Sequence, residues 1–597
     1  MRELRGALRL IRRAAPWDAA VTLMLGVFGG AAGAPAAWIT KALIDSLARP
    51  RGNMSGHVIV LALGAAMLVA VAGSLSYAAG IFAVRLEARV RIETETDLAA
   101  ACARPVGTVH LEDPVQQDRL YLAKRGAHDA PSLLADSSVT IVSSLSSVVS
   151  YAVALWLTWP GMLLALFLAA VPMGLLQRRM SSRAILVAER ATESYRWRDY
   201  YTNLFSVPSS ARDMRLHGAE KEFTRRLRRH LSIALGEETR QRNRTSAMQV
   251  AFTLVNGLIA GVATAAIAVQ VSSGRVSVGA VVLFSTAVLA VQTRLATLIG
   301  VVGRVKVSLG IFAHLLDYVG AAEVTVLGVA DAAPLRTAIE LRDVWFRYDQ
   351  DDPWALSGVS TKLIAGETNA LVGLNGAGKS TLVKLLLRFI EPTAGAILWD
   401  GQDIRTLDPR SLRNRIACVL QDFTAYELTA LENITIGDLK HLGDRDRARR
   451  AADTANAAVV INGMADGVDT MLSVTRSDAA GRRGSTLSGG QWQRIALARA
   501  AMLEHADLLI LDEPSAGLDP EAEHRLSRDL FNLGSGGTRL LISHRLGGVR
   551  LADRIIVLRA GRVVEQGAHD QLMSEDGEYA RLFRLQASDF AEPQVAG

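Results

Sequence analysis

The stretch that decides the fold of the C-terminal half runs from Thr368 to Arg388. It reads as a strand-like segment, Thr368–Val372, then Gly373-Leu374-Asn375-Gly376-Ala377-Gly378-Lys379-Ser380, then a segment of helical composition, Thr381–Arg388. Glycines spaced in this way before Lys-Ser, between a strand and a helix, are typical of a phosphate-binding loop. The glycines let backbone N–H groups turn inward, and the helix N-terminus adds positive potential. The stretch therefore predicts an α/β domain of the phosphate-loop NTPase type.

This loop predicts most of the contacts to a nucleotide. Lys379 supplies a point charge to the β- and γ-phosphates, and Ser380 supplies a hydroxyl to Mg²⁺. We therefore expect ATP and Mg²⁺ as cofactors. The residues of the loop expected to bind the nucleotide are Gly373, Asn375, Gly376, Gly378, Lys379, Ser380 and Thr381.

A second apolar run, Leu508–Leu511, is typical of a buried strand and ends in Asp512 and Glu513. A carboxylate at the end of such a strand is placed to hold the Mg²⁺ shell of a phosphate-loop NTPase. We therefore expect Asp512 and Ser380 to be metal ligands. Glu513, one residue further on, is expected to point at the position of an attacking water.

The segment Leu487–Gln491, Leu-Ser-Gly-Gly-Gln, resembles the signature sequence of ATP-binding cassette (ABC) proteins. In that family the segment lies across the γ-phosphate of a nucleotide held by a second cassette. The resemblance implies that Ser488, Gly489, Gly490 and Gln491 complete a site on another chain, with Asp519 at the seam between the two.

The same resemblance gives roles to four more positions. Glu513 matches the general base, and Gln421 matches the glutamine that links Mg²⁺ and water to the membrane half. His544 matches the switch histidine that contacts the γ-phosphate. Tyr348 matches the aromatic residue that stacks on adenine. Glu513, His544 and Gln421 are therefore the expected catalytic residues, with Gln421 also near the metal.

The N-terminal half contains long runs without Asp, Glu, Lys or Arg, at residues 19–40, 58–84, 137–176, 245–274 and 276–293. A helix needs ~20 apolar residues to cross a bilayer. The longest run fits two helices turned at Trp159-Pro160-Gly161, because proline and glycine interrupt regular structure. The predicted spans are about 17–45, 57–85, 137–158, 160–178, 246–272 and 277–302.

The charges predict the orientation of these spans. Arginines cluster before the first span and between the fourth and fifth, and basic residues accumulate in cytoplasmic loops. The N-terminus, the long intervals 86–136 and 178–245 and the C-terminal half are therefore expected in the cytoplasm, with the helices extended beyond the bilayer. The net charge of +7 is explained in this way, and no nucleic-acid partner is expected. Alanine and arginine usage indicates a bacterial protein, hence one of the inner membrane.

The chain as a whole resembles an ABC exporter half-transporter. The expected fold class is an N-terminal all-α polytopic membrane domain with long cytoplasmic extensions, followed by an α/β domain of the ABC type. The predicted boundaries are a membrane domain at 1–320, a linker at 321–337, a nucleotide-binding domain at 338–590 and a tail at 591–597. A second copy of the chain is the expected partner, forming a homodimer, with a heterodimer as the alternative.

The family resemblance predicts ATP-driven export, but the substrate is open. Trp492 and the turn Leu111–Pro114 resemble a subgroup that exports ribosomal peptide natural products, which favours a peptide. The alternatives are a lipid or lipophilic-drug exporter and, in another class, an ATP-gated channel or regulatory subunit. Arg294 in the sixth span has two interpretations: it snorkels to water, or it faces a cavity for an anionic or peptide substrate. One departure from exporters is the basic loop Gly481–Gly484, where an acidic residue is usual.

Overall fold

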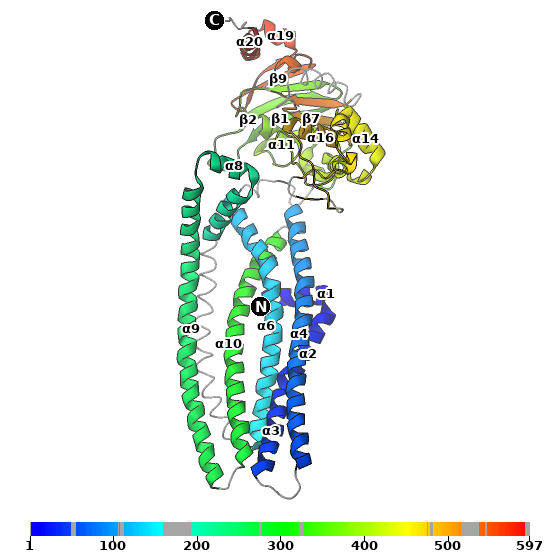
Figure 1. Ribbon diagram of the computed structural model, residues 1–597. Coiled ribbons are helices and arrows are strands. Elements are labelled where there is room, and N and C mark those ends of the chain that lie inside the picture. Colours follow the sequence, from blue (N-terminus) through cyan, green and yellow to red (C-terminus); the bar gives the residue numbers. More distant parts are fainter. Residues whose placement is uncertain are drawn as a thin grey trace. The chain divides into compact units, whose positions relative to one another are not determined.

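The computed structural model describes residues 2–48, 55–104, 107, 113–158, 193–273, 277–321, 328–473, 476–477, 481–514, 537–543 and 546–591. A few side chains within helices α9, α10, α18 and α20 are outside this description. The chain divides into two compact units (Figure 1). The first comprises Met1–Pro105 and Leu111–Val324, and the second comprises Val106–His110 and Thr325–Gly597.

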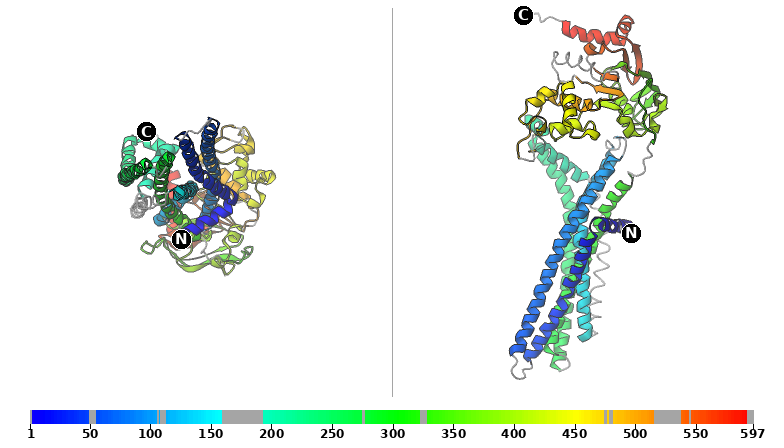
Figure 2. Two further views of the ribbon diagram at one scale, coloured as in Figure 1. Left: turned by 90° about the horizontal axis from the view of Figure 1, so that it is seen from below. Right: turned by 90° about the vertical axis from the view of Figure 1, so that its right-hand side faces the viewer.

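The first unit is built from helices. Among its described residues they are α1 (Arg2–Ala14), α2 (Pro16–Ala31), α3 (Gly33–Ala48), α4 (Ser55–Ala103), α6 (Pro114–Thr158), α8 (Pro208–Leu216), α9 (Glu220–Ser272) and α10 (Val278–Ala321), and residues 193–206 are helical as well. Helices α4, α6 and α10 run side by side along the length of the unit, as Figure 1 and the right-hand view of Figure 2 show. Helix α1 gathers its arginines on one face and buries Ala7 against the bundle, and such an amphipathic helix suits the interface between membrane and water.

The long helices exceed the thickness of a bilayer. Helix α4 has 49 residues and α9 has 53, which at about 1.5 Å per residue gives roughly 70–80 Å, against ~30 Å for the hydrocarbon core. This confirms that helices continue far beyond the apolar runs. Within the described residues, four helices are long and apolar enough to cross a membrane: Pro16–Ala48, Gly56–Ala103, Pro114–Leu157 and Val278–Ala321.

The other two predicted spans stay predictions. The span at 160–178 and its turn at Trp159-Pro160-Gly161 lie outside the described residues. The span at 246–272 falls in the C-terminal part of α9, where the apolar stretch Ser246–Val255 is shorter than a full span among the residues described. The first span also differs from expectation, because the helix is divided at Ala32 into α2 and α3.

Close packing of α2 on α6 depends on small residues and hydroxyl groups. Ser146 Oγ donates to the carbonyl oxygen of Val27 at 2.7 Å, and Ser150 Oγ donates to that of Ala31 at 2.8 Å. Between them, a β-carbon added at Gly30 would lie 2.1 Å from the carbonyl oxygen of Ser143. Small residues that let backbones approach, with hydrogen bonds across the contact, are how helices associate in lipid.

Asp45, near the end of α3, fixes the start of α10. Its carboxylate accepts a hydrogen bond from the backbone N–H of Gly279 at 2.8 Å and another from Ser277 Oγ at 2.9 Å. A carboxylate at this place satisfies a free N–H group and complements the helix dipole. Further along the bundle, α6, α9 and α10 share an apolar cluster with Leu155, Ile267 and Phe284 at its centre.

In its described residues the second unit contains two sheets. The antiparallel sheet has the order β2-β1-β4-β5, with β1 (Ala338–Phe346), β2 (Leu356–Ile364), β4 (Ala394–Trp399) and β5 (Gln402–Asp403). The larger sheet has the order β10-β9-β3-β8-β7-β6, with β3 (Thr368–Val372), β6 (Ile416–Val419), β7 (Leu508–Asp512), β8 (Thr538–Ile542), β9 (Arg554–Arg559) and β10 (Arg562–Gly567). The helices among the described residues are α11 (Lys379–Leu386), α12 (Pro409–Arg413), α13 (Ala430–Thr435), α14 (Arg445–Thr454), α15 (Ala458–Asn462), α16 (Gly489–Ala501), α18 (Leu546–Val549), α19 (His569–Ser574) and α20 (Glu578–Ala591).

The larger sheet places the predicted site. Strands β9, β3, β8, β7 and β6 pair in parallel, and all five residues of β3 are buried. Parallel strands covered on both faces are near-continuous apolar runs, which is the pattern of β7 and of Ala370–Val372 in β3. Strand β8 lies between β3 and β7, and all three run in the same direction. The loops that follow β3 and β7 therefore emerge at the same edge of the sheet.

A prediction follows for the contact between α2 and α6. Gly30→Ala places a β-carbon against the Ser143 carbonyl, so we expect it to lower the thermal unfolding midpoint in detergent, at a cost of ~1–3 kcal/mol for overpacking. The matched control is Gly73→Ala on α4, where a β-carbon meets nothing within 4 Å. That change is expected to be neutral or stabilising, since alanine is the better helix former. Equal midpoints for the two variants would contradict the close contact.

Candidate functional site

The loop after β3 has the backbone of a phosphate cradle. Gly376 and Gly378 have φ angles of 78° and 103°, in the region that side chains rarely adopt. A β-carbon at Gly378 would also lie 2.7 Å from the carbonyl oxygen of Ala355, and one at Gly373 would lie 2.3 Å from that of Leu558. Only glycine therefore fits at these positions. Asn375 and Gly376 lie at the exposed tip, and Ser380 is exposed in the first turn of α11.

Lys379 is held under this loop. Its side chain is only 7% exposed, and Nζ donates to the carbonyl oxygens of Gly373 at 2.7 Å and Leu374 at 3.1 Å. Burial lowers the pKa of Lys379, while the carboxylates of Glu513 and Asp512 act in the opposite direction. A partly desolvated ammonium is a strong electrostatic partner for phosphate oxygens, because little water has to be displaced from it.

Asp512 and Glu513 lie where β7 ends. Asp512 is 5% exposed, and its pKa is raised to about 6, first by burial and then by the neighbouring charge of Glu513, while Lys379 lowers it. Gln421, after β6, donates from Nε2 to the Glu513 carboxylate at 2.8 Å. The structure therefore brings together Lys379, Asp512, Glu513 and Gln421, which come from three separate stretches of the chain.

These residues fit a magnesium ion carried by a nucleotide. Mg²⁺ in such sites takes one or two protein oxygens and completes its shell with phosphates and water. The Ser380 hydroxyl and the buried Asp512 carboxylate are donors of this kind, and burial together with the neighbouring charge of Glu513 raises the pKa of Asp512. In the part of the chain that the structure describes, no group of three or more His, Cys, Asp or Glu residues forms a separate metal site.

Tyr348 lies beside the first turns of α11. Its hydroxyl is 3.3 Å from Thr381 Oγ1, and Lys384 Nζ is 5.6 Å from the centre of its ring. Phe346 packs edge-on against the ring, with 5.0 Å between the ring centres. The side chain remains 42% exposed. Tyr348 is therefore fixed next to the phosphate loop while a large part of it stays open to a ligand.

The signature segment, residues 487–491, begins α16. Ser488 is the N-cap: its backbone N–H donates to Gln491 Oε1 at 2.9 Å, and its hydroxyl accepts from the Gln491 backbone at 3.4 Å. This reciprocal pair fixes the entry to the helix. Ser488 and Gly489 are exposed and Gly490 is half-buried. Among the described residues, no hydrogen bond or ion pair joins the signature segment to the phosphate loop of the same chain.

Two of the predicted site residues, Asp519 and His544, lie outside the described residues. Two further polar residues of this unit were not predicted from the sequence. Gln493 and Arg499 are polar residues on the buried side of α16, and Arg499 bonds to the Asn433 carbonyl at 2.9 Å, to Asn433 Oδ1 at 3.0 Å and to the Thr424 carbonyl at 3.1 Å. Their only signal in the sequence is a polar residue at a position that should be apolar in an amphipathic helix.

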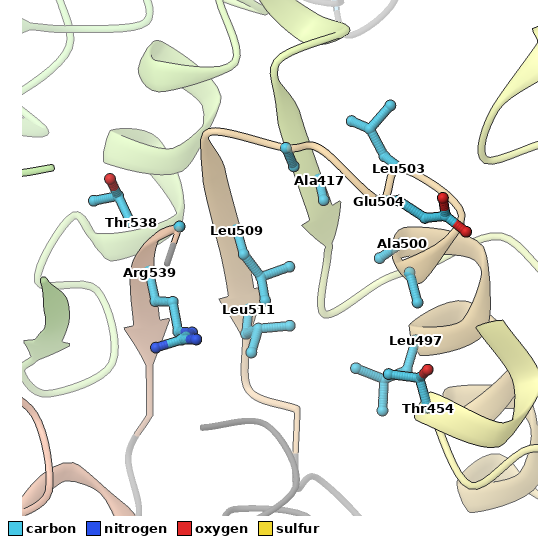
Figure 3. A pocket seen from close by; sticks show the side chains of 13 residues that line it. Ala417, Thr454, Leu497, Ala500, Leu503, Glu504, Leu509, Leu511, Thr538 and Arg539 are labelled. Carbon is cyan, nitrogen blue, oxygen red and sulfur yellow. The ribbon is translucent and has the colours of Figure 1, made fainter. Parts of the chain in front are cut away.

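Two other features of this unit lie outside the nucleotide site. A cavity of about 190 Å³ lies between α16 and the strands β7 and β8 (Figure 3). It is lined mostly by apolar side chains such as Leu497, Leu509 and Leu511, so it does not offer phosphate ligands. In the basic loop before the signature segment, Arg482 pairs with Asp466 of the same domain and Arg483 is exposed.

Fold and site together define a phosphate-loop ATPase joined to a bundle of membrane-crossing helices. Residues 356–516 match a family model described as ABC transporter. The chain is 35% identical over 467 residues to an ATP-dependent lipid A-core flippase of Thiobacillus denitrificans, covering 76% of this chain and 75% of that protein. It is 41% identical over 255 residues to a putative multidrug export ATP-binding/permease protein of Bacillus subtilis, covering 43% of this chain and 42% of that one.

The structural comparison agrees. A bacterial Atm1-family ABC exporter solved with ATP bound superposes with a TM-score of 0.81 at 25% identity, covering 98% of this chain and 100% of that one. The chain therefore belongs to the ABC transporter family and is a half-transporter of the exporter type. It couples ATP hydrolysis to transport, and it is a multi-pass protein of the bacterial inner membrane with its ATPase domain in the cytoplasm.

Proposed function

We propose that two copies of this chain form an exporter that moves an anionic amphipathic lipid across the inner membrane. The observation that carries the proposal is the match to a lipid A-core flippase over 467 residues. That match is longer than the whole second unit, Thr325–Gly597, so it extends into the helical unit where a substrate binds. The peptide substrate favoured by Trp492 and Leu111–Pro114 has no support in the comparisons.

A charge in the helical unit supports an anionic substrate. Arg294 is exposed on α10, and Ser285, Leu289 and Thr293 are exposed on the same helix at spacings of about one turn. The hydroxyls of Ser285 and Thr293 donate to carbonyl oxygens of α10 itself. The stretch 285–294 of α10 therefore presents aliphatic carbon, backbone-satisfied hydroxyls and one guanidinium, which suits a ligand with an acyl region and a phosphate or carboxylate headgroup.

In the proposed dimer, two ATP molecules lie between the copies. The phosphate loop and Lys379 of one copy face the signature segment of the other, which explains why that segment is exposed in a single chain. When bound, Mg²⁺ on Ser380 and Asp512 neutralises charge on the β- and γ-phosphates. Glu513 takes the proton of the attacking water, and the Gln421 amide orients its carboxylate. Asp519 and His544 keep the roles expected from the family.

The role of Glu513 is tested by Glu513→Gln. The change keeps the size of the side chain and removes the base, so ATPase turnover of the purified protein is expected to fall by about 10²–10⁴-fold. Binding of ATP is expected to persist, because Lys379 and the phosphate loop are unchanged. Turnover near that of the wild type would remove Glu513 from the role of base.

The substrate class is tested in proteoliposomes. We expect ATP-dependent transfer of a fluorescent anionic lipid between leaflets, with little transfer of a zwitterionic lipid of the same chain length. Arg294→Ala is expected to reduce transfer of the anionic lipid severalfold, and Arg294→Lys to retain most of it, since the positive charge is kept. The Glu513→Gln protein is the control for transfer without hydrolysis. Transport of peptides or uncharged drugs, with no movement of either lipid, would contradict the proposal.

A further inference from the structure

Gln493 is a polar side chain in a place where an apolar one would be expected. It lies on α16 five positions after Ser488 and is 5% exposed. Its Nε2 donates to the backbone carbonyl oxygen of Glu513 at 3.4 Å and also to that of Pro514. Its Oε1 has no hydrogen-bond partner among the described residues. An amide with one unsatisfied buried oxygen disfavours folding relative to an apolar side chain of the same shape. In return, the amide group of Gln493 fixes the backbone at Glu513, the proposed general base, by hydrogen bonding.

That backbone is strained. Glu513 has φ at 51°, a left-handed conformation that a residue other than glycine keeps only when its surroundings impose it. Two hydrogen bonds do so. The N–H of Glu513 donates to the Ile542 carbonyl of β8 at 2.9 Å, and the carbonyl of Glu513 accepts from Gln493. The strained residue is therefore held on one side by the sheet and on the other side by α16.

The direction of the Glu513 carboxylate depends on this conformation. The carboxylate meets Gln421 Nε2 at 2.8 Å and lies close enough to Asp512 and Lys379 to shift their pKa values. Relaxation of φ would turn the side chain away from these partners. Since a base acts only within hydrogen-bond reach of the water it deprotonates, a small rotation is enough to reduce turnover.

We infer that Gln493 is a positioning residue for the general base, and that α16 thereby joins the signature segment of a chain to the Glu513 of the same chain. The inference rests on the proposed dimer and on the proposed role of Glu513. From Ser488 to Gln493 the helix rises by about 7–8 Å. The N-terminus of α16 meets the ATP held by the second copy, while Gln493 holds the base that acts on the chain's own ATP. One rigid helix therefore connects the two ATP sites.

The first test compares Gln493→Met with Met502→Ala. Methionine has the size of glutamine and cannot donate to the carbonyls, so we expect the turnover number to fall about 5- to 10-fold with less than about a twofold change in KM for ATP. Met502, at the C-terminal end of α16, is 1% exposed, and its truncation is expected to lower the unfolding midpoint without this loss of turnover. Gln493→Leu, which likewise cannot donate to the carbonyls, is expected to behave as Gln493→Met does. Wild-type turnover in both Gln493 variants would overturn the inference.

The second test uses mixed dimers in which one copy carries Glu513→Gln, so that hydrolysis depends on the base of the other copy. Gln493→Met is expected to slow ATP hydrolysis when it is in the copy with the intact base, and to have little effect in the copy with Glu513→Gln. The opposite pattern would mean that Gln493 supports only the signature segment, which serves the site across the dimer, and would overturn the inference. Full activity of the Glu513→Gln homodimer would instead contradict the proposed base, so the two failures are distinguishable.

Discussion

The nucleotide domain depends on one electrostatic constraint: the buried carboxylate of Asp512, the half-buried carboxylate of Glu513 and the buried ammonium of Lys379 lie together at one edge of a parallel sheet. Asp512 is buried next to Glu513, and its pKa is raised to about 6 as a result. Lys379, which comes from the loop two strands away, is the cation that offsets them. Such an arrangement is costly without a ligand and suits a ligand that brings both phosphate and a divalent cation.

The rest of the unit keeps these groups in place. The order β3-β8-β7 sets the separation between the phosphate loop and the carboxylates, and the glycine contacts at 373 and 378 fix the loop against its neighbours. Helix α16 adds a hold on Glu513 from the opposite side, through a side chain that is itself incompletely satisfied. The strained backbone of Glu513 is therefore held in place both by the sheet and by the helix that begins with the signature segment.

Much of this site could be predicted from the sequence, because its reactive side chains lie in short segments located where strands end. The phosphate loop, Asp512, Glu513 and Gln421 are of this kind, and the structure brings Lys379, Asp512, Glu513 and Gln421 together. Gln493 could not be predicted, because its meaning depends on which carbonyl groups lie across the helix in three dimensions.

The same limit applies to the membrane half. The apolar runs predicted long helices, but the bonds from Ser146 and Ser150 to α2 depend on helix rotation, which composition does not determine. The sequence indicates the substrate even less clearly. In the proposed exporter, a few side chains such as Arg294 would distinguish lipid from peptide, and a sequence motif beside the signature segment is a poor guide to them.

In the proposed dimer each ATP site is shared by two chains, and complementation in mixed dimers tests this sharing. Lys379→Ala and Ser488→Ala homodimers each have two damaged sites and are expected to be inactive. If sites are shared, a dimer with one change in each chain keeps one intact site and regains ATPase activity, whereas wild-type chain paired with a chain carrying both changes has none. Activity in the second dimer and not in the first would show that each chain completes its own site, and would contradict the account.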